Sequence, residues 1–199
     1  MKQKILIALL VCSLLSCGKS NPSTALLEVS YPQEWIFTYD ESSTEYTYLR
    51  SNNGNPLFRK KILKTYSLTQ LAIDEDCKFH VATAGKINGR ESFTIQSVKK
   101  MERWWEVYFP INNTEGFVQQ SGFSTTEPPC NNPADCDNWR FFLHDMPKVD
   151  GVKTVAIESV KHPGWYISIT SPTFQWANNL LTVQQYSSPD KATRFQCRK

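Results

Sequence analysis

A short motif occurs twice in the chain, and this repeat constrains the fold more than any other feature. Residues 95–99 read IQSVK and residues 157–161 read IESVK, an offset of 62 positions. After a turn of nearly equal length, Trp104-Trp105 follows the first copy and Trp165-Tyr166 follows the second. A repeat of this length indicates an architecture in which one small unit is used several times.

The turn in the second copy can be predicted from its residues. In IESVKHPGWYIS, residues 157–168, Pro163 fixes its own φ and Gly164 tolerates a positive φ, so the pair favours a tight turn. The flanking residues are β-branched or aromatic, which favours strands over helix. We therefore predict a β-hairpin with a structural role at the start of a third repeat.

Short aromatic segments complete the pattern, one around each of Phe79, Phe141 and Phe195. Three units of roughly 45–60 residues, each with about four strands, predict a β-trefoil, because one unit cannot bury its own apolar face and three close a barrel. We predict a single all-β domain over residues 28–199. Its expected core residues are Phe79, Ile95, Val98, Phe141, Ile157, Val160, Ile167 and Phe195. A two-repeat sandwich or jelly roll is the alternative.

The third repeat also resembles known families. AIESVKHPGWYIS, followed by KATRF at residues 191–195, is similar to the last repeat of interleukin-1-like trefoils and to the arabinose-binding trefoil domains of arabinofuranosidases. The resemblance implies the fold and transfers no site, because the shared residues are packing residues. The sugar-binding family commonly continues with Arg-His after the aromatic pair, whereas this chain continues with Ile167 and Ser168.

Residues 1–16 are predicted to be a lipoprotein signal peptide. Lys2 and Lys4 precede an apolar run over residues 5–15, which is too short to span a bilayer comfortably but suits a signal sequence. The run ends in LLSC, which resembles the lipobox of bacterial lipoproteins and implies that the Cys17 thiol is acylated. An ordinary signal peptide or an internal helix is the alternative.

This signal predicts where the protein is located. Residues 17–27 are expected to form a tether. Gly18 stands where enteric bacteria place Asp as an inner-membrane retention signal, so we expect an anchor in the outer membrane, with the periplasmic or surface face left open. Removing Lys2 and Lys4 lowers the formal charge from +3 to +1, which argues against nucleic acid as a partner.

Export also decides how the cysteines are interpreted. Four cysteines remain after Cys17, and an even number in an oxidising compartment favours disulfides. Cys130 and Cys136 enclose the turn-rich NNPAD, so their pairing is plausible and would leave Cys77 with Cys197. A zinc site is disfavoured, because the sequence has no CxxC and its histidines lack ligand-like spacing to the cysteines. We expect no metal and no cofactor.

Aromatic residues suggest the function more strongly than any catalytic motif does. The sequence has no GxSxG, HExxH or phosphate loop, so we expect a non-catalytic protein, with a divergent glycoside hydrolase as a minor alternative. It has six tryptophans and eight tyrosines, and flat rings stack on sugars. In the adjacent pair Trp104-Trp105, strand alternation predicts at most one core residue.

The leading hypothesis is a carbohydrate-binding module with its site in the third repeat. An indole beside amides is the chemistry of a sugar subsite. The candidate residues are His162, Trp165, Gln175, Trp176, Asn178 and Asn179. The alternative is a protein-interaction trefoil, such as a protease inhibitor or host-interaction ligand, that uses the long irregular segment 119–138.

Overall fold

The computed structural model describes residues 33–40, 45–51, 58–63, 74–110, 116–121, 128, 130, 133–169 and 180–199. The predicted signal peptide, Cys17 and the predicted tether lie outside these ranges. The helices within them are far shorter than a bilayer-spanning helix must be. They are α2 (Pro133–Cys136) and the 3-10 helices η1 (Glu75–Cys77), η2 (Asp137–Trp139) and η4 (Pro189–Lys191).

The remaining structure is β-sheet, which confirms the all-β prediction. The strands are β1 (Gln33–Asp40), β2 (Glu45–Arg50), β3 (Phe58–Leu63), β4 (Phe79–Ile87), β5 (Arg90–Ser97), β6 (Trp104–Tyr108), β7 (Gly116–Ser121), β8 (Phe141–Val149), β9 (Val152–Ser159), β10 (Trp165–Ser168), β11 (Thr182–Gln185) and β12 (Phe195–Arg198). They belong to one 12-stranded sheet.

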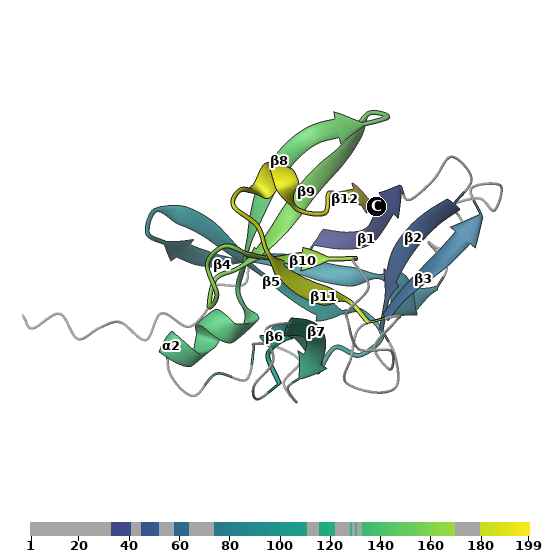
Figure 1. The fold of residues 1–199 in the computed structure, drawn as a ribbon. Helices are drawn as coiled ribbons and strands as arrows, with labels where there is room; N and C mark the ends of the chain where they lie inside the picture. Colours follow the sequence, from purple (N-terminus) through teal and green to yellow (C-terminus); the bar gives the residue numbers. More distant parts are fainter. Residues whose placement is uncertain are drawn as a thin grey trace, which may run out of the picture.

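The strand pairings close a barrel and repeat along the chain. β1 pairs with β4, β4 with β5, β5 with β8, β8 with β9, β9 with β12 and β12 with β1, so these strands form a closed ring of antiparallel neighbours. The other strands form the hairpins β2–β3, β6–β7 and β10–β11, which attach to β1, β5 and β9. Figure 1 shows β6 and β7 below the barrel strands and the β8–β9 hairpin above them.

The polar residues of the repeated motif form hydrogen bonds to the turns that follow β5 and β9. Ser97 Oγ accepts a hydrogen bond from Lys100 N at 3.2 Å, and Ser159 Oγ accepts one from His162 N at 3.2 Å. Each serine therefore satisfies a backbone donor in the turn after its strand, as short polar side chains commonly do. The residue before each serine also reaches its turn: Gln96 Nε2 donates to Met101 O.

Glu158 holds the Pro-Gly turn in the second copy. Its Oε1 accepts a hydrogen bond from Gly164 N at 2.8 Å, and Gly164 has the positive φ of 82° that its sequence predicts. The Trp165 N–H then bonds His162 O at 3.1 Å, which closes the turn before β10. The predicted hairpin role of residues 157–168 is confirmed.

Most of the predicted core lies in the barrel. Six of the eight residues belong to the main buried cluster, which also contains Trp35, Phe37 and Trp105: Phe79, Ile95, Phe141, Ile157, Ile167 and Phe195. Val160 is buried outside that cluster and Val98 is only half-buried. Both valines come directly after the ends of β5 and β9, in the turns, so strand alternation no longer directs them inward.

Trp105 belongs to the main core cluster and Trp104 does not, but Trp104 is buried as well, which strand alternation does not predict. The exposed fractions of Trp104 and Trp105 are 2% and 0%. Trp105 packs edge-on against Phe79 in the barrel, with ring centroids 4.8 Å apart. Trp104 points to the opposite face, where it lies across from Ser121, and η2 packs against that side of β6, with Trp139 Nε1 donating to Ser121 Oγ at 3.1 Å. Both faces of β6 are therefore covered.

The cysteine prediction is correct for one pair. Cys130 and Cys136 form a disulfide, which closes the segment leading into η2. Cys77 and Cys197 are free thiols, so the prediction that they pair with each other is wrong. They lie in different surroundings, Cys77 beside Asp74 and Cys197 beside Lys153, which keeps the two sulfurs apart. Burial raises the pKa of each thiol to about 12, so neither is a reactive thiolate.

Candidate functional site

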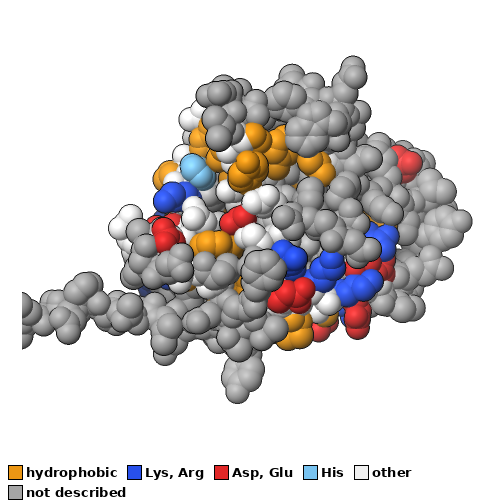
Figure 2. Space-filling view, turned by 90° about the horizontal axis from the view of Figure 1, so that it is seen from below, with side chains coloured by type: hydrophobic (Ala, Val, Ile, Leu, Met, Phe, Trp, Pro, Cys, Tyr) orange, Lys and Arg blue, Asp and Glu red, His pale blue; other side chains and the backbone are white. Residues whose placement is uncertain are grey.

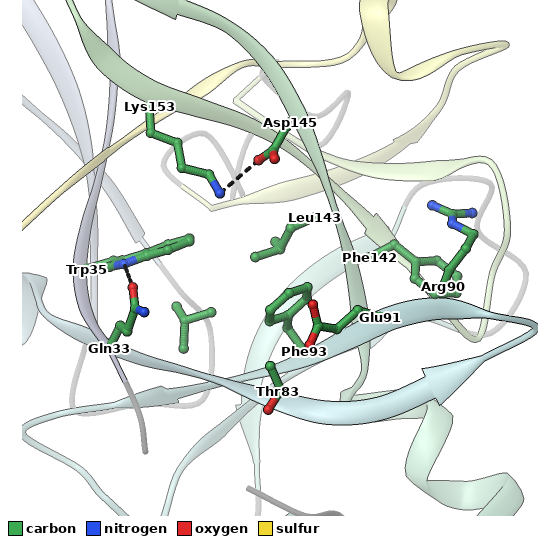
Figure 3. Close-up of a pocket in the computed structure, with 11 residues that line it drawn as sticks. Gln33, Trp35, Thr83, Arg90, Glu91, Phe93, Phe142, Leu143, Asp145 and Lys153 are labelled. Carbon is green, nitrogen blue, oxygen red and sulfur yellow. Dashed lines mark hydrogen bonds and ion pairs between the residues drawn. The ribbon is translucent and has the colours of Figure 1, made fainter. Parts of the chain in front are cut away.

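A pocket of about 520 Å³ opens at the end of the barrel where β1, β5 and β9 begin. We call it the barrel-mouth pocket. Its volume lies in the range of small-molecule sites. Figure 3 shows the side chains around it, which are Gln33, Trp35, Val81, Thr83, Arg90, Glu91, Phe93, Phe142, Leu143, Asp145 and Lys153.

Strand alternation produces two layers in this pocket. Residues two apart on a strand face the same side, so β1, β4, β5 and β8 each supply one apolar residue toward the core and one polar residue nearer solvent. The apolar and polar pairs are Trp35 with Gln33, Val81 with Thr83, Phe93 with Glu91, and Leu143 with Asp145. The apolar residues belong to or pack against the main core. The pocket therefore has an apolar floor and a polar rim.

Aromatic rings dominate the floor. Trp35 is only 7% exposed and packs edge-on against Phe37, with centroids 5.9 Å apart. Its Nε1 donates to Gln33 Oε1 at 3.3 Å, and Lys153 Nζ lies 5.6 Å from its ring centre. On another side of the pocket, Arg90 lies over the Phe142 ring at 3.9 Å. The rings are thus held in place before any ligand arrives.

The charged side chains of the rim are mostly paired. Lys153 Nζ lies 2.8 Å from Asp145 Oδ1, in an exposed ion pair. Arg90 Nη2 lies 3.4 Å from Glu158 Oε2 and 3.0 Å from His144 Nε2. Glu91 is exposed and has no ion-pair partner among the residues that the structure describes.

Glu158 is a buried carboxylate that contacts both the rim and the Pro-Gly turn. Its Oε2 lies 2.6 Å from His144 Nε2, while its Oε1 accepts the Gly164 N–H. Burial acts to raise the pKa of Glu158, but the hydrogen bonds from Gly164 and His144 and the charge of Arg90 lower it by more. The pKa of this carboxyl therefore lies below its usual value, and the side chain carries its charge at neutral pH.

The sugar site predicted in the third repeat is described only in part. Gln175, Trp176, Asn178 and Asn179 lie outside the described residues. The structure brings His162 and Trp165 together through Phe109, whose ring centroid lies 4.6 Å from one and 4.9 Å from the other. Burial, with a smaller contribution from Lys161, lowers the pKa of His162. These rings pack edge-on against one another at the opposite end of β9 from Lys153.

Sequence reasoning missed the barrel-mouth pocket. The segment that begins at Trp35 contains no copy of the IQSVK and IESVK motif, so its equivalence to core positions of the later units cannot be read from the sequence. Glu91 and Asp145 stand near turns and look like ordinary solvated charges. The usable signal is alternation: a polar residue two positions from an aromatic or aliphatic residue at the same end of several strands.

The remaining described surface contains no obvious metal centre. Within the described ranges, no three His, Cys, Asp or Glu side chains are grouped as a metal site requires.

On the face below β6 and β7, Lys and Arg side chains lie beside Asp and Glu, while hydrophobic side chains gather in another part (Figure 2). Met101 and Tyr108, which are 45% and 47% exposed, lie just before β6 and at its end.

Comparison with known proteins supports the fold. A mutant of interleukin-1 beta from Gallus superposes with a TM-score of 0.57 at 12% identity, covering 86% of this chain and 98% of the other. A mosquitocidal holotoxin superposes with a TM-score of 0.52 at 12% identity, covering 86% of this chain and 18% of the toxin. No family model and no curated protein sequence matches the chain. At this identity the likeness shows a β-trefoil-like fold alone.

Proposed function

We propose that this chain is a non-catalytic, lipid-anchored binding protein of the bacterial envelope, built as a three-repeat β-trefoil, and that it binds carbohydrate in the barrel-mouth pocket. The observation that carries the proposal is the layered lining of this pocket. A fixed indole and a phenyl ring form its floor, and an amide, a hydroxyl and charged groups form its rim.

This lining matches the two kinds of surface that a sugar presents. The C–H faces of a pyranose pack on aromatic rings, here Trp35 and Phe93. Sugar hydroxyls exchange hydrogen bonds with groups that both donate and accept, here the Gln33 amide and the Thr83 hydroxyl. The rings are pre-positioned by the core, so little side-chain entropy is lost when a ligand binds.

Binding is tested with the full-length chain in detergent on a glycan array, followed by titration with the best ligand. The replacement Trp35→Phe retains an aromatic ring in the core but shortens it. It is expected to weaken binding about tenfold, since stacking area is lost. A silent array, or equal affinity of the Trp35→Phe chain, contradicts the proposed site.

The anchor is a separate part of the proposal. With a lipid on Cys17, residues 17–27 would form a tether between the bilayer and the domain. A fully extended tether of this length holds the barrel up to roughly 40 Å from its attachment point. Labelled palmitate should enter the wild-type chain and should not enter the Cys17→Ala chain. Equal labelling of the two chains contradicts lipidation.

The Cys130–Cys136 disulfide favours a second candidate function, which is binding to another protein. The disulfide stabilises the segment that leads into η2, and η2 packs against β6, a strand flanked by the exposed Met101 and ending at the exposed Tyr108. A rigid segment beside exposed apolar side chains suits a protein contact. A protease panel tests this function: tight inhibition together with a silent glycan array would place it first.

A further inference from the structure

One carboxylate that lines the barrel-mouth pocket has no ion pair within the described residues, and the class of sugar can be inferred from it. Of the charged residues that line it, Lys153 is neutralised by Asp145 at 2.8 Å. Arg90 lies 3.4 Å from Glu158 in an ion pair, and its guanidinium carbon lies 3.9 Å from the centre of the Phe142 ring. Glu91 has no such partner within the described part of the chain: Lys86 lies across from it on β4, but no ion pair joins the two side chains.

Glu91 is placed where a ligand in the pocket can reach it. It lies on β5 two residues before Phe93, and Figure 3 shows its carboxylate beside the Phe93 ring, directed toward the middle of the pocket. Trp35 stands across the pocket from it. A ring that packs on this floor therefore brings one of its substituents to the Glu91 carboxylate.

We propose that the pocket selects an amino sugar with a free primary ammonium group, which Glu91 binds; this inference rests on the proposed carbohydrate function. An ammonium group donates three hydrogen bonds, and its positive charge can form the ion pair that the Glu91 carboxylate does not make within the described chain. A sugar carboxylate meets repulsion at the same place. An N-acetyl group removes the ammonium charge and leaves Glu91 without a counter-charge.

The shape of the pocket favours a sugar ring over a lysine side chain as the source of the ammonium. A lysine stem is narrow and flexible, and it would leave much of the roughly 520 Å³ cavity and its aromatic floor unfilled. A pyranose ring covers the floor while its hydroxyls face Gln33 and Thr83. The cavity also accommodates a disaccharide better than a single side chain.

The test compares three disaccharides on the full-length chain in detergent: the β-1,4 glucosamine dimer, its fully N-acetylated form and cellobiose. We expect the glucosamine dimer to bind about fivefold more tightly than either neutral disaccharide at low salt. This preference should shrink as sodium chloride is raised, because the ion pair is partly exposed. Nα-acetyl-lysine should bind more weakly than the glucosamine dimer.

Glu91→Gln is the diagnostic variant, because it keeps the size of the side chain and removes its charge. The ratio of affinities for the cationic and N-acetylated dimers should fall close to one. Glu75→Gln is the matched control, since Glu75 is an exposed carboxylate in η1 outside the pocket, and it should keep the ratio of the wild-type chain. Thermal unfolding of both variants verifies that they are folded.

The outcomes separate the two proposals. If the neutral disaccharides bind as tightly as the glucosamine dimer, or if Glu91→Gln leaves the preference intact, selection by Glu91 is wrong and carbohydrate binding stands. If Nα-acetyl-lysine binds as tightly as the dimer, the pocket recognises an ammonium group without the sugar, and the inference is overturned. If no disaccharide binds, both the inference and the carbohydrate function fail.

Discussion

The two ends of the barrel each present aromatic rings, but the rings have different surroundings. Beyond the end of β9, Phe109 packs edge-on against His162 and Trp165, so these rings cover part of one another's surface. At the opposite end, Trp35 and Phe93 belong to the floor of an open pocket with a polar rim. The comparison shows that aromatic content alone does not mark a binding site. What matters is whether the rings face a cavity or one another.

The largest effect is expected from removing the ring in the pocket floor. Trp35→Ala deletes a nearly buried indole that contacts Phe37, and it should lower the free energy of unfolding by about 3–5 kcal/mol. Urea denaturation measures this loss. If stability is nearly unchanged, the ring is not part of the core, and the contrast between the two ends is wrong.

A smaller effect is expected from the carboxylate that contacts both regions. Glu158→Gln removes the charge that faces His144 and Arg90, and it should cost about 1–3 kcal/mol at neutral pH. The pKa of Glu158 is lowered in the folded chain, so the folded state binds fewer protons at this group than the unfolded state does. Its contribution is therefore complete above the ordinary glutamate pKa and is lost as pH falls below it.

Unfolding of the two chains from pH 7 to pH 3 tests this pH dependence. The difference in unfolding free energy between wild type and Glu158→Gln should narrow as acid protonates the wild-type carboxyl. A difference that is constant over this range contradicts the assigned charge of Glu158. Glu75→Gln serves as the control, because its carboxylate is exposed on η1.

The ring group beyond β9 should respond more weakly. Trp165 is half-buried, and Trp165→Ala should cost about 1–2 kcal/mol of stability through the lost contact with Phe109. Titration of Trp165→Ala and Trp176→Ala with the best glycan sharpens the comparison. If either variant weakens binding tenfold or more while Trp35→Phe does not, the sugar site lies in the third repeat.

The smallest effect is expected at the rim. The ion pair between Lys153 and Asp145 is short, but its side chains are 49% and 76% exposed. Lys153→Ala and Asp145→Ala, combined in a double-mutant cycle, should give a coupling energy of about 0.2–1 kcal/mol that declines with salt. A coupling well above this range would mean that the rim is a rigid part of the pocket.

The sequence predicted the architecture better than the site. Ser97 and Ser159 occupy the same position in the two copies of the motif, and they predict equivalent turns. Aromatic residues such as Phe79 and Phe141 likewise predict equivalent strands, because the same local pattern recurs wherever the same unit is folded. The burial of Trp104 was missed, because η2 covers it from more than thirty residues away in the chain. Strand alternation assigns a residue to a face but does not tell what covers that face.

The pairing of Cys77 with Cys197 failed for a similar reason. Counting cysteines shows which pairs are possible, whereas a disulfide needs two sulfurs brought within bonding distance. Among the described cysteines, the tertiary structure places these two thiols in different surroundings and joins Cys130 to Cys136, which are close along the chain.

Taken by itself, the sequence determined the β-rich composition, the repeated unit and the Pro-Gly turn, and it favoured the nearby Cys130–Cys136 pair, because all of these depend on residues close together in the chain. Only the tertiary structure decided that Gln33, Glu91 and Lys153 surround one pocket. They come from three different units of the chain, and only closure of the barrel brings the beginnings of β1, β5 and β9 to the same end.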